Sequence, residues 1–296
     1  MIYGAIEAGG TKWVCAKGTG PDDLRENVVF STTTPEETIR RAIAFFNENG
    51  AEPVAAVGVG SFGPVELRVS SPSWGSITNT PKPGWQNTNI IGLLEEGIDV
   101  PLAFDTDVNA AAIAEHRWGA ARGLSTFYYI TVGTGIGAGG MVNDQLMHGL
   151  VHPEFGHIPV PHDRDSDPFP GVCPFHGDCL EGLASGEALR ARWGKQGELI
   201  TDDRAWALEA DYLAIGIVSA IFALSPQRIV IGGGVMKQPS LLPRIHARVL
   251  ELVAGYIDID EQAGGIDRYI VAPVLGDRAG VLGAIELARA CALSHV

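Results

Sequence analysis

Short apolar runs alternate with amphipathic stretches along this chain, a pattern typical of an α/β protein. Residues 2–6 and 12–16 read as two strands joined by a turn at Gly9-Gly10, so a β-hairpin with a glycine tip opens the chain. Apolar residues at helical spacing predict a helix over 35–49 that stops at Gly50. The other elements predicted in the first half are strand 54–59, an irregular loop over 70–85, strand 102–104 and helix 108–118.

The opening pattern recurs near the middle of the chain. Predicted strands over 127–132 and 136–142 flank a second glycine turn, Gly133-Thr134-Gly135. The later elements that we predict are helices over 185–194, 202–210 and 212–224, a strand over 228–231 and a helix over 281–292.

Two halves that each open with a glycine-tipped hairpin predict duplicated α/β lobes around a cleft. We assign residues 1–117 to an N-terminal lobe, to which a C-terminal helix within 281–296 returns, and residues 118–280 to a C-terminal lobe. The loop over 70–85 is rich in Ser, Pro, Gly and Asn, which makes it a candidate lid over a ligand.

Composition narrows the class of partner. With 296 residues, of which 46% are hydrophobic, the chain can bury one large core or two medium ones. A formal net charge of −14 disfavours an unaided nucleic-acid surface, so we expect no nucleic-acid partner. An anionic substrate needs local compensation from backbone N–H groups or a metal ion.

The compartment is predicted from what the chain lacks. The N-terminus has no basic start followed by an apolar run, so we expect no signal peptide. No stretch reaches the ~20 apolar residues that a membrane span requires, so we expect no membrane partner. Cys15 and Cys291 are far apart in sequence, which indicates a reducing compartment rather than a disulfide framework, and the cytoplasm is expected.

Metal ligands are concentrated in one segment. Cys173, His176 and Cys179 are each separated by two residues, so a tight loop can direct all three at one ion. With His157 as the fourth ligand, two thiolates and two imidazoles form a closed tetrahedral set for Zn²⁺, typical of a structural site. The alternative is a pair of free buried thiols beside surface histidines.

The glycine turns are candidate phosphate sites. Gly9-Gly10-Thr11-Lys12 and Gly133-Thr134-Gly135 lack the Walker A spacing, but each offers backbone N–H groups with no Cβ in the way. Such a nest binds phosphate without net positive charge on the protein. Gly232-Gly233-Gly234 is a third place where a nucleotide could approach the backbone. The alternative in each case is an ordinary turn.

A candidate base follows the predicted strand 102–104. Asp107 stands where the next helix begins, at the carboxyl end of a strand, which is where ligands bind in open α/β sheets. A carboxylate at a helix N-terminus is stabilised as the anion and can accept a hydroxyl proton during phosphoryl transfer. The alternative is plain helix capping by Asp105 or Asp107.

Taken in order, these segments resemble the ROK family (repressors, open reading frames and sugar kinases) over essentially the whole chain, and within it the bacterial zinc-containing fructokinases. The segments that carry the resemblance are Glu7–Lys12, Asp105-Thr106-Asp107-Val108-Asn109-Ala110-Ala111, Thr131-Val132-Gly133-Thr134-Gly135-Ile136-Gly137, Glu154-Phe155-Gly156-His157 and residues 173–181. The resemblance implies the actin-like ATPase/hexokinase (ribonuclease H-like) fold. It also implies ATP-dependent phosphorylation of a hexose, with Mg²⁺ and structural Zn²⁺ as cofactors, and a homodimer.

The resemblance also implies roles for single residues. Asp107 matches the general base that acts on the sugar's 6-hydroxyl. The phosphate and nucleotide positions match Gly10, Thr11, Lys12, Thr134, Gly135, Gly233 and Gly234, and the positions that hold sugar hydroxyls match Glu154, His157, Glu181 and, more weakly, Asn79. Glu7 stands near the Mg²⁺–phosphate position. His157 then links the metal to the sugar.

Two departures from the family pattern bear on the substrate. Many members carry Asp in place of Glu7, and glucokinases often carry Asn in place of Thr106. Both departures are consistent with fructose, and mannokinase, glucokinase or N-acylhexosamine kinase remain the alternatives. A sugar-responsive transcription repressor is a distant alternative, because it needs a DNA-binding helix-turn-helix before the first hairpin. An actin-like filament or chaperone ATPase is expected to lack a sugar base beside a zinc site.

Overall fold

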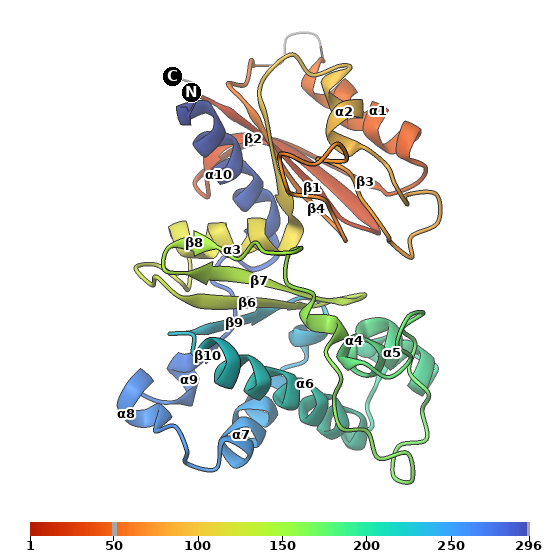
Figure 1. The fold of residues 1–296 in the computed structure, drawn as a ribbon, viewed down its shortest axis with the longest axis vertical. Coiled ribbons are helices and arrows are strands. Elements are labelled where there is room, and N and C mark those ends of the chain that lie inside the picture. The colour runs from red at the N-terminus through yellow and green to blue at the C-terminus, as the bar shows by residue number, and fades with distance from the viewer. Residues whose placement is uncertain (49–51, 295–296) are drawn as a thin grey trace. The chain divides into compact units, whose positions relative to one another are not determined.

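The computed structural model describes residues 1–48 and 52–294, which form two compact units, each built on a five-stranded sheet (Figure 1). Unit 1 comprises Met1–Arg122, Leu146–His152 and Val274–Val296, and unit 2 comprises Gly123–Gln145 and Pro153–Pro273. The segment Leu146–His152 therefore belongs to unit 1, although it lies between two parts of unit 2 in sequence.

The sheet of unit 1 has the order β3-β2-β1-β4-β5. Its first three strands are antiparallel neighbours, and the last two run parallel to β1. The strands are β1 (Tyr3–Ala8), β2 (Lys12–Gly20), β3 (Asp23–Ser31), β4 (Val57–Ser61) and β5 (Leu102–Thr106). The predicted opening hairpin is confirmed as β1–β2. Strand β3 was not predicted, because its sequence is mostly polar and most of its side chains are at least partly exposed.

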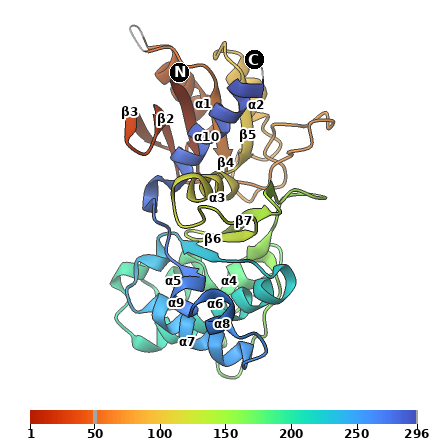
Figure 2. The same cartoon turned by 90° about the vertical axis from the view of Figure 1, so that its left-hand side faces the viewer.

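Alternate residues of β1 pack into two separate cores, one on each face of the sheet. Ile6 packs with α1 (Pro35–Phe46) and α2 (Ile90–Glu95), whereas Ala5 packs with α10 (Ala279–Ser294) on the opposite face (Figure 2). The alternation follows from the two-residue period of a strand. Helix α1 begins after the cap Thr34 and ends at Phe46, and the predicted stop at Gly50 lies outside the described residues.

Helix α10 lies very close to both β4 and α3 (Asp107–Trp118). A Cβ atom on Gly58 would stand 2.0 Å from the backbone oxygen of Ala284, and one on Gly283 would stand 1.7 Å from that of Ala110. Glycine is therefore required at both positions, since any side chain would push α10 away. The close packing fixes α3, which carries Asp107, against the rest of unit 1.

The sheet of unit 2 has the order β10-β9-β6-β7-β8. Its strands are β6 (Phe127–Val132), β7 (Ile136–Val142), β8 (Gln145–Leu146), β9 (Ile229–Gly232) and β10 (Ile270–Val271). Its helices are α4 (Leu180–Ala184), α5 (Gly186–Trp193), α6 (Asp203–Leu224), α7 (Leu241–Val253), α8 (Ile259–Ala263) and α9 (Ile266–Tyr269), and α6 and α7 lie on one face of the sheet (Figure 1). The predicted second hairpin is confirmed residue for residue as β6–β7.

Helix α6 corrects two expectations. The predicted helices 202–210 and 212–224 are one continuous helix. Asp211, which was expected to separate them, is helical, and its side chain pairs with Arg248 on α7. By length and composition alone α6 could also cross a membrane, so the expectation that no stretch is apolar enough was wrong. More than half of its most apolar window is buried, as in the core helix of a soluble domain.

Candidate active site

The turn from β5 into α3 presents Asp107. Thr106 caps the helix, since its side-chain oxygen accepts the backbone N–H of Asn109 at 3.0 Å. The alternative of capping by Asp105 or Asp107 is therefore wrong. Asp107 is the first residue of α3, is half-buried, and accepts the N–H of Val108 at 2.8 Å. Its carboxylate lies where the helix dipole stabilises an anion.

Asp105 stands directly before this turn and is buried, with 3% of its surface exposed. One of its carboxylate oxygens accepts from the Thr106 backbone N–H at 2.7 Å and from the Asn109 amide at 2.8 Å. The other lies 2.9 Å from Nε2 of His148. The hydrogen bond to Asp105 raises the pKa of His148, against partial desolvation. Sequence reasoning gave Asp105 no role beyond capping and gave His148 none.

The first glycine turn is closed by its own backbone and braced by β3. The N–H of Gly9 donates to the oxygen of Lys12 at 3.0 Å, and the Thr32 hydroxyl donates to the oxygen of Gly9 at 2.7 Å. Thr11 and Lys12 at the tip are exposed, and Gly10 is half-buried. The turn is thus a fixed, accessible array of backbone groups, the arrangement that an anion-binding nest needs.

Glu7 lies at the base of this turn, against the first turn of α10. A Cβ atom on Gly280 would stand 2.5 Å from its carboxyl carbon, and the Val281 backbone N–H donates to it. Burial raises the pKa of Glu7, while the charge of Lys12 and the bond from Val281 act in the opposite direction. The Glu7 carboxyl group therefore lies between the N-terminus of α10 and the charge of Lys12.

The second glycine turn is docked on α5 and on Glu181. The N–H of Gly186 donates to the oxygen of Gly133 at 2.7 Å, and the N–H of Ile136 donates to Glu181 at 2.9 Å. A Cβ atom on Gly135 would stand only 2.5 Å from the same Glu181 oxygen, so a side chain there would displace the carboxylate that holds the turn. Exposed Thr134 forms the tip.

The third glycine run meets the same hairpin. Gly233 has φ +100°, and a Cβ atom there would stand 2.3 Å from the backbone oxygen of Val132. The structure therefore brings Gly233 against the strand end that precedes Gly133, while Gly234 beside it is exposed with open space around its Cα.

The four predicted metal ligands come together in unit 2. Nδ1 of His157 lies 3.7 Å from Sγ of both Cys173 and Cys179, and Nδ1 of His176 lies 3.7 Å from Sγ of Cys173. All four ligand atoms lie within 4.8 Å of one another. Zinc bond lengths of about 2.3 Å to sulfur and about 2.0–2.1 Å to nitrogen give tetrahedral S–N edges of about 3.6 Å. The spacing and the donor set both fit one tetrahedral ion.

A carboxylate lies near the other ring nitrogen of His157. Its Nε2 lies 4.0 Å from a carboxylate oxygen of Glu154. Burial and the nearby charge of Glu181 raise the pKa of Glu154 to about 7. Glu154, His157 and Glu181 therefore lie in one unit, beside the metal ligands and the second glycine turn. Asn79 lies in unit 1, where its side-chain oxygen accepts from Gln86 at 2.8 Å.

The ROK family model matches residues 3–291. The chain belongs to the ROK family. Fructokinase from Zymomonas mobilis subsp. mobilis is 44% identical over 296 residues, with 98% of this chain and 97% of that protein covered. Fructokinase from Lactococcus lactis subsp. cremoris is 42% identical over 290 residues, with 97% of each covered.

Solved structures agree with the family match. A ROK hexokinase from Thermus thermophilus has a TM-score of 0.76 at 27% identity, with 98% of both chains covered. The predicted fold class, the α/β actin-like ATPase/hexokinase fold, is thereby confirmed.

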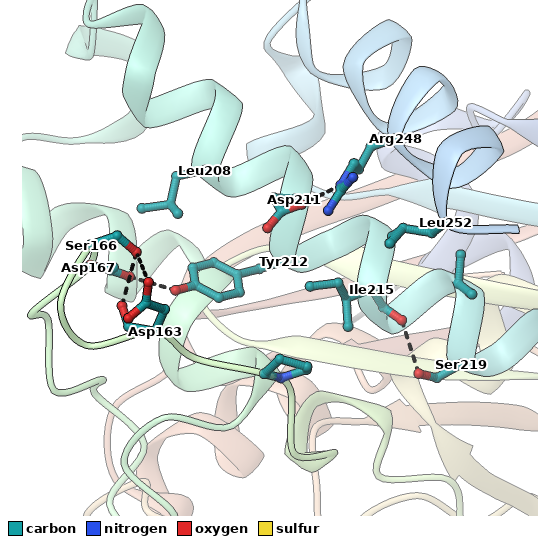
Figure 3. Close-up of a pocket in the computed structure, with 12 residues that line it drawn as sticks. Asp163, Ser166, Asp167, Leu208, Asp211, Tyr212, Ile215, Ser219, Arg248 and Leu252 are labelled. Carbon is teal, nitrogen blue, oxygen red and sulfur yellow. Dashed lines mark hydrogen bonds and ion pairs between the residues drawn. The ribbon is translucent and has the colours of Figure 1, made fainter. Parts of the chain in front are cut away.

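A hollow in unit 2 contains none of the predicted residues of this ROK protein. It has a volume of about 590 Å³ and lies between α6, α7 and the loop around 161–167 (Figure 3). Its polar groups pair with one another: Tyr212 donates to Asp167 at 2.7 Å, and Arg248 lies 2.5 Å from Asp211. These pairs tie the loop to the helices, so we assign the hollow a structural origin and place the chemistry at the predicted residues.

Proposed function

We propose that this protein is an ATP-dependent fructokinase that transfers the terminal phosphoryl group of ATP to the 6-hydroxyl of D-fructose. The observation that carries the proposal is that four relatives named fructokinase are 40–44% identical over nearly the full length of this chain. Glucokinases are matched at 26–27%. Mannokinase, glucokinase and N-acylhexosamine kinase are the alternatives within the family.

In this proposal Asp107 accepts the proton of the 6-hydroxyl as the oxygen attacks phosphorus. The base has to be ionised and directed at the sugar, and the first turn of a helix supports both requirements. Thr106 relieves Asp107 of capping, since the threonine hydroxyl already holds the Asn109 N–H. Most of the rate enhancement then comes from positioning and electrostatics, as in phosphoryl transfer generally.

The nucleotide phosphates are held by the two glycine turns and by Lys12. Gly9, Gly10 and Thr11 supply the first nest, and Thr134 and Gly135 the second. Gly233 and Gly234 lie on the nucleotide side. Mg²⁺ bound with ATP would supply charge neutralisation of the phosphates, and we assign to Glu7 the role of orienting it.

We also propose a structural zinc ion at His157, Cys173, His176 and Cys179. When bound, Zn²⁺ closes a four-ligand site with no open position, so it stabilises the loop and performs no hydrolysis. The proposal rests on the edge lengths of 3.7 Å and on the two-sulfur, two-nitrogen donor set. Because Nδ1 of His157 faces this set and Nε2 faces Glu154, the ring couples the metal loop to the acidic side.

The fructose hydroxyls are assigned to Glu154, His157, Glu181 and, from unit 1, Asn79. Glu181 also holds the second glycine turn through the Ile136 N–H, so one carboxylate supports both sugar and phosphate sides. Side chains that each pair with a sugar hydroxyl discriminate among hexoses, because the wrong sugar leaves one of them unpaired.

The test is ADP release, measured with fructose, mannose, glucose and N-acetylmannosamine at equal concentrations. We expect the highest kcat/KM with fructose. A higher value with another sugar would reassign the enzyme within the family, and equal ADP release without any sugar would indicate an ATPase instead.

Size-exclusion chromatography with light scattering tests the predicted homodimer. We also propose a cytoplasmic location, because none of the four cysteines forms a disulfide in the structure.

A further inference from the structure

We call the segment Leu146–His152 of unit 1 the strap. Two of its histidines, His148 and His152, bind it to the rest of unit 1. His152 is buried, and its Nε2 lies 3.1 Å from the backbone N of Val65, so it accepts that N–H. His148 reaches Asp105 at 2.9 Å. The first contact is to an ordinary loop amide, whereas the second is to the turn that carries Asp107.

The protonation of His148 follows from its neighbours. Its Nε2 lies 2.9 Å from the Asp105 carboxylate and 3.3 Å from the amide nitrogen of Asn109. The Asn109 amide already donates to Asp105 at 2.8 Å, so both nitrogens converge on one acceptor. A carboxylate accepts from several donors, and we therefore place the hydrogen of His148 on Nε2.

Asp105 divides its two oxygens between the strap and α3. One oxygen receives His148, and the other receives the N–H of Thr106 and the side chain of Asn109. Thr106 and Asn109 are themselves joined by the helix cap, at 3.0 Å, and they stand on either side of Asp107 in sequence. The buried carboxylate therefore fixes the turn on both sides of the base.

We propose that His148 is a positioning residue for phosphoryl transfer. Its N–H holds Asp105, Asp105 holds the Thr106–Asn109 turn, and the turn aims the Asp107 carboxylate. The contact of the strap with Asp105 thus fixes the orientation of the Asp107 carboxylate. This inference rests on the proposed role of Asp107.

The physical cost of losing His148 is local. Asp105 is 3% exposed, so removal of the imidazole leaves one oxygen of a buried carboxylate without its N–H donor. The carboxylate then turns to find another donor and carries the attached turn with it. A displacement of about 1 Å at a reacting group can cost as much as 10²-fold in rate.

The experiment measures kcat and KM for fructose and ATP in His148→Ala and His148→Gln. We expect His148→Ala to lower kcat by about 10–100-fold with both KM values changed less than about twofold, because binding is made elsewhere. His148→Gln keeps an N–H donor and is expected to retain kcat within about threefold of wild type. Near-wild-type kcat in His148→Ala, or equal losses in both variants, would overturn the proposal.

A second measurement separates positioning of the base from general damage. In an Asp107→Asn background, His148→Ala is expected to leave the residual kcat unchanged, since the group that His148 positions is already lost. The same fold-loss in both backgrounds would contradict the inference. If Asp107→Asn itself turns over at the wild-type rate, the assignment of the base fails, and that outcome is distinct from failure of the strap.

Discussion

The two units hold their predicted site residues by different physical means. In unit 1, Asp107 begins a twelve-residue helix, and hydrogen bonds of the adjoining strand and strap support it. In unit 2, the proposed metal ligands and Glu154 lie in the segment 153–179, whose only regular element is the short 3₁₀ helix Phe155–His157. A base at the start of a helix is held by the fold itself, whereas a long irregular segment gains stability from a cross-link, here the proposed zinc site.

The largest expected effect is on the base itself. Asp107→Asn removes the proton acceptor but keeps size and polarity, so kcat should fall by about 10²–10⁴-fold while fructose still binds. Steady-state kinetics and isothermal titration with fructose measure both quantities. A kcat within about threefold of wild type would mean that another group takes the proton.

The contacts that hold α3 in unit 1 can be tested at Glu115, two turns along the helix from Asp107. This fully buried carboxylate accepts the N–H groups of Ala120, Val274 and Leu275 at 2.6, 3.2 and 2.8 Å. Glu115→Ala leaves three N–H groups without their acceptor and should cost about 2–4 kcal/mol of stability. Glu115→Gln, which keeps one acceptor oxygen, should cost less.

Urea unfolding compares these two variants, and added zinc should restore neither. Equal stability of Glu115→Ala and wild type would show that α3 is held by apolar packing alone.

Removal of the proposed zinc ion should loosen unit 2 and leave unit 1 unchanged. In the zinc-free protein, or in Cys179→Ser, residues 153–181 should exchange amide hydrogens faster, and KM for fructose should rise about tenfold. Exchange around Asp107 should stay the same. Cys291→Ser in unit 1 is the matched cysteine control. Unchanged fructose affinity in folded, metal-free protein would remove His157 from its linking role.

The smallest effect concerns a buried acid on α6 in unit 2. Glu209 has no exposed surface, and burial raises its pKa well above the ordinary value of 4.5. Between the unfolded and folded pKa values the folded state retains a proton that the unfolded state releases, so stability falls as pH rises from about 5. Glu209→Gln cannot titrate and should flatten this dependence.

Melting temperatures at pH 5.5 and 8 measure the flattening, with Glu198→Gln at an exposed position as control. Parallel pH profiles for wild type and Glu209→Gln would contradict it.

The features that could be predicted from sequence are those set by local chemistry. Strands β6 and β7 follow from apolar runs around a glycine turn, and the metal set follows from the spacing of Cys173, His176 and Cys179. The contact of His148 with Asp105 joins residues 43 apart, and no local period encodes it. The same holds for Glu181 against Gly135, which only the folded chain brings together.

The most direct test of the account is a crystal structure with fructose and a non-hydrolysable ATP analogue. We predict a carboxylate oxygen of Asp107 within about 2.6–3.2 Å of the fructose 6-hydroxyl, with that hydroxyl facing the terminal phosphate. A 6-hydroxyl held by a different side chain, with Asp107 turned away from it, would contradict the central claim.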